Sequence, residues 1–362
     1  MKMLVKMGIV FITVMLIVVS TDVQAGQNTQ QLSISSPYTY KNLTIFLIQG
    51  KDQLSRNYLT LEEAMKQKKI ILHETSNVGE LSADNISKEY VFIMAGDIVK
   101  GGRQDRTIGE DIVLAPGAKR VALKSFCVEE GRWGGRGAES TADFSSSAKM
   151  LNNKELKIAA RTEKDQNKVW KEVADYQEKV SRKAGAEVKS GASPTSLQLS
   201  LENEKVKGII AEYVHALQPA FEGKKDVIGF AFFVNGKIST VETFGNAALF
   251  QKLQKKLLEA AVSEAFEQYD KGLKFETPTK AALAAFMEMA EKGTETARQT
   301  SANMMEYTKK TTNSILLRSI NTDAGKAALH TSIYYVEDVS AFKEKDDSGY
   351  QYGGMQRNRT RR

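Results

Sequence analysis

The stretch VIGFAFFVNGKISTVETF, residues 227–244, decides the fold class, because it holds two apolar runs joined by Asn235-Gly236. Asn-Gly between two such runs is the strongest short-range signal for a β-hairpin, since both residues tolerate the positive φ angles of a two-residue turn. The sequence therefore predicts strands at 227–234 and 237–243, with their aromatic side chains packed in a core.

The rest of the chain has strands and helices in blocks rather than in strict βαβ alternation, which is typical of an α+β fold. Thr60 and Glu63 have the spacing of a capping box and predict a short helix. The other predicted helices are 147–184, 205–217, 246–269 and one or two within 279–308. The other predicted strands are 43–48, 70–74, 90–95, 112–115, 119–128 and 327–336, with 112–115 and 119–128 paired as a hairpin around Pro116-Gly117.

A glycine- and serine-rich loop at 131–147 divides the predicted domain, 42–342, into two halves. Residues 131–137 include four glycines, and 140–147 are small and polar. We expect a strand-rich half at 42–133, followed by a half at 148–342 that holds helices, the Asn-Gly hairpin and further helices. Residues 26–41 are predicted to be a flexible leader, and 343–362 a basic disordered tail.

Residues 1–25 have the three parts of a secretory signal peptide. Lys2 and Lys6 precede an apolar run at 7–19, and Val23 and Ala25 are small residues suited to a cleavage site. An uncleaved membrane anchor is the alternative, but the run is shorter than the roughly 20 residues that a spanning helix needs. We therefore expect an exported bacterial protein, periplasmic or extracellular, with no membrane span after signal removal.

The composition argues against several other classes of protein. The net charge is +7, but residues 1–25 carry +1 and the four terminal arginines +4, which leaves +2 for the body, so we expect no nucleic-acid partner. Cys127 is the single cysteine, which rules out an intrachain disulfide. It is more simply an inert thiol than a nucleophile, because Glu129 and Glu130 would repel an anionic substrate. The three histidines are isolated, so we predict no metal site and no cofactor.

Two polar segments, 96–106 and 127–133, follow core-like strands, and loops on a rigid scaffold commonly carry function. Asp97 and Glu129 are the candidate acid and base, because two carboxylates in one cleft push their pKa values apart. The alternative is that these charges form surface salt bridges. The candidate ligand-binding residues are Lys100, Gln104, Arg106, Arg132 and Trp133, which offer cations for a phosphate or carboxylate and an indole face for a base or sugar.

These segments carry a family resemblance. GDIVKGGRQDR at 96–106 and CVEEGRW at 127–133 resemble the core of the ADP-ribosylglycohydrolase and rhodanese-phosphatase-superfamily-associated protein domain. Residues 166–170 and 229–250 are similar to its later signatures, and the resemblance runs from about 42 to 342. It implies the handling of ADP-ribose-like or phosphate-bearing compounds, by association of domains and not by a known reaction.

Three functions remain open at this point. The first is a binding domain without catalysis, which takes a small anionic or phosphate- or sugar-bearing ligand on the two loops. The second is a hydrolase-like enzyme that uses Asp97 and Glu129 as acid and base, with Arg106 and Arg132 orienting an ADP-ribose-like substrate. The third is a structural partner of an envelope protein, through the charged helices at 148–184 and 280–310. The sequence favours the first and is silent on the oligomeric state.

Overall fold

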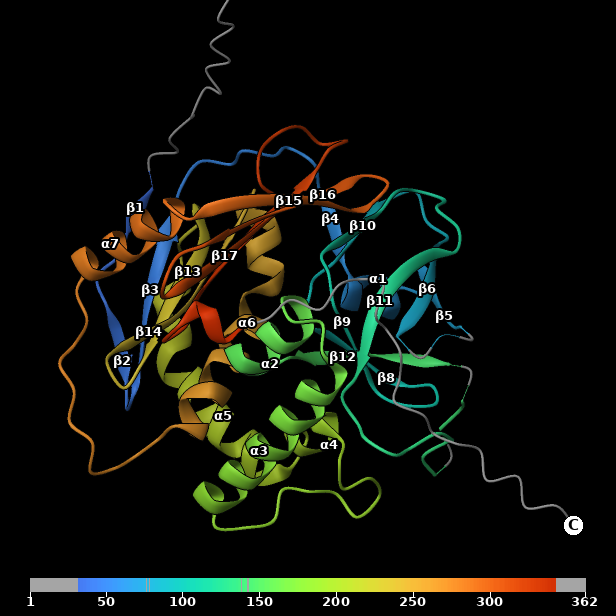
Figure 1. Ribbon diagram of the computed structural model, residues 1–362, viewed down its shortest axis with the longest axis horizontal. Helices are drawn as coiled ribbons and strands as arrows, with labels where there is room; N and C mark the ends of the chain where they lie inside the picture. Colours follow the sequence, from blue (N-terminus) through green and yellow to red (C-terminus); the bar gives the residue numbers. More distant parts are fainter. Residues whose placement is uncertain (1–31, 76, 78, 138, 142, 343–362) are drawn as a thin grey trace, which may run out of the picture. The chain divides into compact units, whose positions relative to one another are not determined.

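The computed structural model describes residues 32–342, apart from positions 76, 78, 138 and 142 (Figure 1). The predicted signal peptide, the start of the predicted leader and the predicted basic tail lie outside the described residues. Within the described part, no helix is long and apolar enough to cross a membrane.

Three sheets and seven α-helices make up the described chain, which confirms the α+β class (Figure 1). The largest sheet has nine strands in the order β1-β3-β13-β14-β18-β17-β16-β15, with β2 also paired to β3. Its strands are β1 (Ser33–Ile34), β2 (Tyr38–Tyr40), β3 (Leu43–Gln49), β13 (Val227–Val234), β14 (Lys237–Phe244), β15 (Thr294–Ser301), β16 (Met304–Lys310), β17 (Ser314–Asn321) and β18 (His330–Tyr335).

The two smaller sheets are formed by the segment between β3 and the long helices. A three-stranded sheet has the order β10-β7-β4, from β4 (Tyr58–Thr60), β7 (Tyr90–Ile93) and β10 (Ile112–Leu114). A six-stranded sheet has the order β12-β8-β9-β11-β6-β5. Its strands are β5 (Ile70–Glu74), β6 (Glu80–Asn85), β8 (Asp97–Gly101), β9 (Arg106–Ile108), β11 (Val121–Cys127) and β12 (Phe144–Met150).

Helices cover both faces of the nine-stranded sheet. The long α6 packs on β13 and β14, α3 and α5 pack on α6, and α7 packs on β16 and β17 (Figure 1). The helices are α1 (Leu61–Lys66), α2 (Lys154–Arg161), α3 (Gln166–Ala184), α4 (Leu197–Leu201), α5 (Glu204–Leu217), α6 (Ala247–Glu267) and α7 (Lys280–Glu291), with 3₁₀ turns at Gln218–Phe221 and Val339–Ala341.

The strand β13 shows why the hairpin sequence is apolar throughout. Successive side chains of a strand point to opposite faces of its sheet. Phe230 and Phe232 belong to the core cluster shared with α6, whereas Ala231 and Phe233 belong to the cluster shared with α7. A strand buried on both faces needs a nearly continuous apolar run rather than an alternating one.

The Asn-Gly turn and the capping box are confirmed. Asn235 and Gly236 have φ angles of 53° and 77°, and Val234 pairs with Lys237, as a two-residue turn with two positive φ angles requires. At α1, the Thr60 side chain accepts from the backbone N–H of Glu63, whose carboxylate accepts from that of Thr60. Both features depend only on neighbouring residues.

The predicted flexible leader is wrong for residues 33–34 and 38–40. These residues form β1 and β2, and both strands pair antiparallel with β3 on the edge opposite β13. The segment is short and polar, so its strand state comes from backbone hydrogen bonds to β3 and not from its own composition.

Of the one or two helices predicted within 279–308, one is present, α7. Residues 294–310 are the antiparallel pair β15 and β16, and the next strand, β17, has no counterpart in the predictions. The strand β15 is largely exposed and polar. Its pattern therefore lacks the alternation that identifies a half-buried strand.

Two further predictions near the polar loops need correction. The strands β10 and β11 exist, but they form no hairpin: β10 pairs with β7, and β11 pairs with β6 and β9. The expected loop at 140–147 overlaps β12, which pairs with β8. The long helical pattern from 147 is divided into α2 and α3, each with its own N-cap, Asn153 and Asp165.

Candidate functional site

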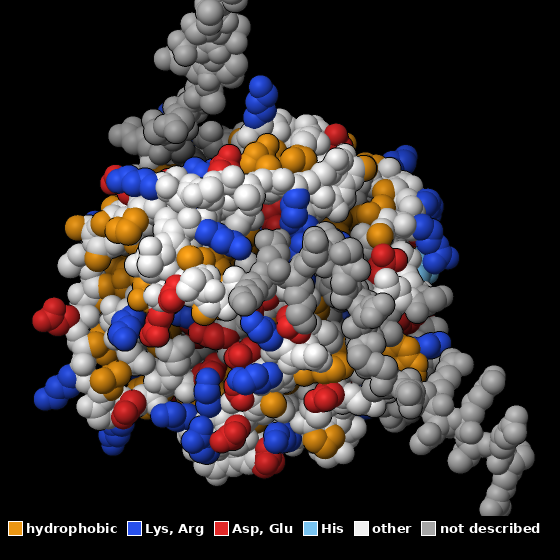
Figure 2. Space-filling model, viewed as in Figure 1, with side chains coloured by type: hydrophobic (Ala, Val, Ile, Leu, Met, Phe, Trp, Pro, Cys, Tyr) orange, Lys and Arg blue, Asp and Glu red, His pale blue; other side chains and the backbone are white. Residues whose placement is uncertain are grey.

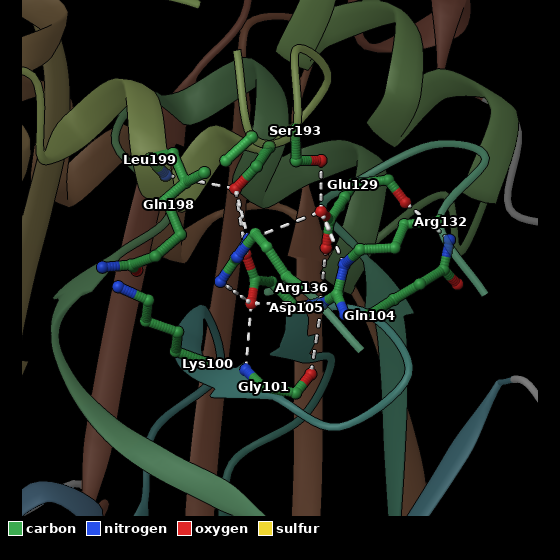
Figure 3. Close-up of polar contacts among 12 residues, drawn as sticks. Lys100, Gly101, Gln104, Asp105, Glu129, Arg132, Arg136, Ser193, Gln198 and Leu199 are labelled. Atoms are coloured by element: carbon green, nitrogen blue, oxygen red, sulfur yellow. Dashed lines mark hydrogen bonds and ion pairs between the residues drawn. The ribbon is translucent and has the colours of Figure 1, made fainter. Parts of the chain in front are cut away.

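The two predicted polar loops meet at one end of the six-stranded sheet (Figure 3). Arg106 of β9 lies opposite Cys127 of β11 in antiparallel register. Residues that precede Arg106 therefore lie beside residues that follow Cys127. A third loop, 190–196, joins them, because the backbone N–H of Leu197 donates to the carbonyl of Val128 over 3.0 Å.

Asp105 is the centre of the charge cluster at this junction, and its side chain is fully buried. The Arg136 guanidinium binds it through two hydrogen bonds, 2.9 Å to Oδ2 and 3.2 Å to Oδ1. The Ser196 hydroxyl donates to Oδ2 over 2.9 Å, and the Gly101 backbone N–H donates to Oδ1 over 3.0 Å. A bidentate arginine with further donors is what a buried carboxylate requires.

Glu129 is the second carboxylate of the loop cluster and is also fully buried. It accepts from the Asp105 backbone N–H over 3.0 Å and from the Ser193 hydroxyl. Its Oε1 atom lies 2.7 Å from Arg132 Nε and 3.4 Å from Arg136 Nη1. We call Asp105, Glu129, Arg132 and Arg136, with Ser193 and Ser196, the loop cluster.

The loop cluster keeps Arg136 charged. Burial alone would lower the pKa of the Arg136 guanidinium, but the hydrogen bonds and negative charge of Asp105, with help from Glu139 and Glu129, raise that pKa above its usual range. Removing Arg136 would leave two buried carboxylates with one cation fewer, so this side chain holds the three loops together.

The glycines at the end of β8 allow the close approach of Asp143 and Phe144. Gly102 has a φ of +56°, and a Cβ there would lie 2.4 Å from the ring of Phe144. At Gly101, with a φ of +111°, a Cβ would lie 2.7 Å from the Asp143 carbonyl oxygen. Both positions therefore need glycine for space and for backbone conformation.

Four of the predicted ligand-binding residues lie at this junction. Gln104 is buried, and its amide donates to the Glu129 carbonyl over 2.8 Å and accepts from the Cys127 thiol over 3.0 Å. Arg132 also donates to the carbonyl of Gly102. Arg106 is fully buried, 3.6 Å from a Glu74 carboxylate oxygen. Trp133 is the fourth.

Trp133 lies at the solvent-facing rim of the loop cluster. Its side chain is 46% exposed. The guanidinium of exposed Arg103 lies 5.3 Å from the indole centroid, and that of Arg106 lies 6.0 Å from it. Exposed aromatic surface beside two guanidinium groups can stack on a planar ring and attract an anion.

Asp97 and Lys100 are engaged elsewhere. Asp97 is buried at the start of β8, where its carboxylate lies 2.8 Å from Lys256 Nζ. Lys100 lies 2.8 Å from a carboxylate oxygen of Glu202. Since β8 ends at Gly101, which binds Asp105, Asp97 is about 13 Å of strand from the loop cluster. The structure therefore does not place Asp97 with Glu129; Asp105 is the carboxylate beside Glu129.

Sequence reasoning missed Asp105, Arg136, Ser193 and Ser196 as site residues. Asp105 lies within the polar segment 96–106, and the available signal was its position directly before Arg106, the first residue of the strand that pairs with Cys127. Arg136 lies in the glycine-rich loop, where the spacing of charges carries no information about partners. Ser193 and Ser196 come from a segment some 60 residues after Glu129 in the chain, so only tertiary contact joins them to the site.

A second buried network lies between α2 and the nine-stranded sheet. His330 of β18 donates from Nδ1 to Asp111 over 2.8 Å and from Nε2 to Glu242 over 2.9 Å when protonated. Arg161 of α2 lies 2.8 Å from Asp111, and Lys157 lies 3.1 Å from Glu242. All five side chains are buried. We call them the sheet network.

The charges of the sheet network shift each other's pKa values. Burial alone would lower the pKa of His330, but Asp111 and Glu242 raise it to about 9. Burial would raise the pKa of Glu242, but Lys157 and His330 lower it to about 2. Arg161 and His330 likewise hold the pKa of Asp111 well below its usual range against the effect of burial. At neutral pH all five groups are therefore charged.

The described residues contain no group of three or more His, Cys, Asp or Glu side chains arranged to hold a metal ion. In the loop cluster, each carboxylate is instead bound by guanidinium groups, hydroxyls and backbone N–H groups.

The protein is therefore an α+β domain in which the buried charged side chains of the loop cluster join three polar loops at one end of the six-stranded sheet. The indole of Trp133 lies at the solvent-facing rim of this cluster. Comparison with protein families matches residues 31–334 to the ARG and Rhodanese-Phosphatase-superfamily-associated Protein domain. The chain belongs to this family, and the resemblance predicted from the sequence is confirmed. Comparisons with curated proteins and with solved structures gave no significant match.

Proposed function

We propose that this chain is an exported binding domain for a small anionic ligand that carries a planar ring or sugar, such as an ADP-ribose-like compound. The ligand binds at the rim formed by the segments 96–106 and 127–133. The observation that supports this most is the exposed indole of Trp133, with the Arg103 guanidinium 5.3 Å and the Arg106 guanidinium 6.0 Å from its centroid.

The loop cluster serves this function as a support. Its carboxylates and guanidinium groups already bind one another, so the fully buried part has its charges compensated. Arg103 is exposed and stands over the indole, so it can contact a phosphate without uncovering a buried carboxylate. A binding surface held by locked side chains loses little entropy when the ligand arrives.

The surrounding surface favours a small ligand over a nucleic acid. On the face shown in Figure 2, basic and acidic side chains are interspersed. Proteins that bind nucleic acid by its backbone instead gather Lys and Arg in a patch or stripe. One indole with adjacent guanidinium groups suits a single ring and its phosphate.

Titration calorimetry with ADP-ribose, ADP, ribose 5-phosphate and inorganic phosphate tests the proposal on the chain without residues 1–25. Trp133→Ala is expected to weaken binding of the ring-bearing compounds by about 1–3 kcal/mol, the usual contribution of one stacked base. Trp133→Phe, which keeps a ring, should retain most of the affinity. Arg103→Ala should weaken every phosphate-bearing compound.

Arg182→Ala is the matched control for Arg103→Ala, because Arg182 is a highly exposed arginine on α3, away from the loops. Binding that survives both Trp133→Ala and Arg103→Ala would refute a site at this rim. Equal losses of affinity in Arg103→Ala and Arg182→Ala would mean that binding depends on the net charge of the protein and not on the position of Arg103.

The hydrolase-like function remains the alternative, with Glu129 beside Asp105 as the carboxylate pair rather than beside Asp97. An assay for release of ADP-ribose or phosphate distinguishes the two functions. Turnover lost in Glu129→Gln, with an unchanged melting temperature, would favour the enzyme. Binding at the rim without turnover would favour the binding domain.

Export is the remaining part of the proposal. Cell fractionation and N-terminal sequencing of the accumulated protein test it. A mature protein that begins near Gly26 outside the cytoplasm is expected. A chain that keeps residues 1–25 in the membrane fraction would instead support the anchor.

A further inference from the structure

We infer that the outer edge of β15 is an interaction surface for a second copy of this chain. The two copies pair antiparallel along β15 about a two-fold axis, which joins their nine-stranded sheets into one. The strand β15 is the last in its sheet, and among the described residues it pairs with β16 alone (Figure 1). It holds no residue of the loop cluster, so the inference does not depend on the proposed function.

The outer edge of β15 presents backbone groups that no other strand of the described chain pairs. Successive residues of a strand direct their N–H and C=O groups to opposite sides, so about four of the eight residues of β15 direct them away from β16. A row of such groups is a template for a further strand. Most of the strand is open to solvent, since Thr294, Glu295, Thr296, Ala297 and Gln299 are exposed.

The strand β15 also lacks the features that usually keep an edge from pairing. Natural edge strands are commonly very short, carry Lys or Pro, or are bent by a bulge. At the opposite edge of the same sheet, β1 and β2 have only two and three residues. By contrast, β15 has eight residues with no Lys and no Pro. Its one register shift against β16 lies between Gln299 and Ser301, near its end.

The two charged residues of β15 are compensated within the same chain. The Arg298 guanidinium donates to Glu110 and, over 2.7 Å, to Glu306, and its side chain is only 24% exposed. The carboxylate of Glu295 lies 3.8 Å from Lys309 Nζ of β16. Neither charge therefore stands alone at the edge to repel an approaching strand.

The sequence of β15 is self-complementary when the two-fold axis passes through Ala297. Ala297 then lies opposite its own copy, and its small side chain leaves room at the axis. In this register, Thr294 lies opposite Thr300 of the second copy, Glu295 opposite Gln299, and Thr296 opposite Arg298. Thr–Thr pairs are favourable across strands, and the Gln amide donates to the Glu carboxylate. No like charges lie opposite each other.

Other positions of the axis are less favourable. An axis at Glu295 or at Arg298 places like charges directly opposite each other, which is destabilising. An axis at Thr296 or at Gln299 avoids this, but pairs a shorter length of the eight-residue strand. A two-fold interface requires one patch to be complementary to itself. This match favours a second copy over an unrelated strand.

Analytical ultracentrifugation of the full chain over a concentration series tests the inference. The average mass should rise with concentration toward that of a dimer, and the dimer should be weak, because one strand pair is a small interface. Ala297→Lys and Ala297→Glu should each weaken association at least about threefold, since each places a charge opposite its own copy. An equimolar mixture of the two variants should associate at least as strongly as the native chain.

Ala216→Lys and Ala216→Glu are the matched controls, because Ala216 is an exposed alanine on α5, outside the nine-stranded sheet. Neither control should change the association, and mixing them should add nothing. Recovery on mixing that is specific to position 297 requires the two copies to meet at that residue. A merely destabilising effect of the substitution would not recover.

A cross-link tests the register directly. Residues opposite each other in an antiparallel pair have Cα atoms about 4.5–5.5 Å apart, within the range of about 4.4–6.8 Å that a disulfide spans. Ala297→Cys should therefore form a covalent dimer under diamide much faster than Ala216→Cys. The native Cys127 is fully buried and does not compete.

Three results would overturn the inference. The first is a monomer at every concentration. The second is a failure of the mixed charge variants to recover association, or equal cross-linking at positions 297 and 216. The third is a dimer that appears only after deletion of residues 343–362, which would identify that segment as the occupant of the edge.

Discussion

The loop cluster and the sheet network both bury several charges, but they differ in what surrounds them. The sheet network is closed between α2 and the nine-stranded sheet, and His330 also stacks on Phe244 with ring centroids 4.6 Å apart. The loop cluster joins three loops and leads outward to Trp133, which is 46% exposed. The central charged side chains are buried in both regions, but only the loop cluster continues to a solvent-exposed side chain.

This difference favours the loop cluster over the sheet network as the support of the proposed binding site. A strongly shifted pKa in a buried group is a common sign of a functional site, and by that sign alone His330 would be chosen. Yet the sheet network has every charge paired and sealed, so its geometry fits the attachment of α2 to the sheet. The loop cluster has the exposed rim that a ligand needs. The accessible surface beside the loop cluster is therefore the reason to prefer it over the sheet network as the candidate site.

The largest expected effect comes from opening the sheet network. His330→Leu leaves Asp111 and Glu242 with one cation fewer in a buried site, and should lower the free energy of unfolding by about 3–5 kcal/mol. Urea denaturation measures the change. His215→Leu, at an exposed position of α5, should change it by no more than about 0.5 kcal/mol. Equal effects in the two variants would show that the network contributes little stability.

The pH dependence of stability is the next largest effect. The contribution of His330, whose pKa rises from 6.5 to about 9 on folding, is complete below pH 6.5 and is lost as the pH rises through 9. That of Glu242, whose pKa falls from 4.5 to about 2, is complete above pH 4.5 and is lost as the pH falls through 2. Each amounts to about 3 kcal/mol.

Urea denaturation at pH 5.5, 7.5 and 9.5 tests the alkaline limb, with His330→Leu as the reference. The difference in stability between the native chain and this variant should shrink as the pH rises, because deprotonation removes the same interaction. A difference that stays constant from pH 5.5 to 9.5 would mean that His330 is not charged in the folded protein.

A smaller loss of stability is expected when the loop cluster is opened. Arg136→Met should cost about 2–3 kcal/mol, because Asp105 and Glu129 keep Arg132 and the serine hydroxyls as partners. Hydrogen exchange should accelerate in the segments 128–136 and 190–196. Arg182→Met is the exposed control. A loss larger than that of His330→Leu would reverse the ranking of the two regions.

The smallest effect on stability is expected at the rim. Trp133→Ala should change the free energy of unfolding by no more than about 1 kcal/mol, since the residue is 46% exposed and its ring lies beside the guanidinium groups of exposed Arg103 and buried Arg106. Thermal denaturation measures this change. Loss of ligand binding without loss of stability would mark the rim as functional, whereas a large destabilisation would make Trp133 part of the scaffold.

Much of the fold followed from local pattern. The segments of β3, β5, β13, β14, α5 and α6 were predicted within a few residues, because each has an apolar pattern of the correct period or a turn with defined φ angles. The strands β1, β2 and β15 were missed, because they are short or polar and are strands only where a neighbour accepts and donates their hydrogen bonds. A pattern of side chains says little about such strands.

The sequence predicted that the two polar loops lie together, and they do, but it gave Glu129 the wrong carboxylate neighbour. Gln104, Arg106, Arg132, Trp133 and Glu129 lie at one junction, as expected for segments that leave adjacent strands. Asp97 was placed with them only because it is near in sequence. It lies at the other end of β8, beside Lys256 from a helix more than 150 residues later.

By itself, the sequence determined the α+β class, the Asn235-Gly236 hairpin, the Thr60–Glu63 capping box and the family. These depend on interactions between residues a few positions apart, which a single sequence displays. Tertiary structure alone decided that Arg136 joins Asp105, and that His330 lies between Asp111 and Glu242. A buried charge takes whichever partner the packing of distant strands and helices brings within reach. The pairing depends on the desolvation of both charged side chains, which in turn depends on residues far apart in the sequence, so a local sequence pattern does not predict it.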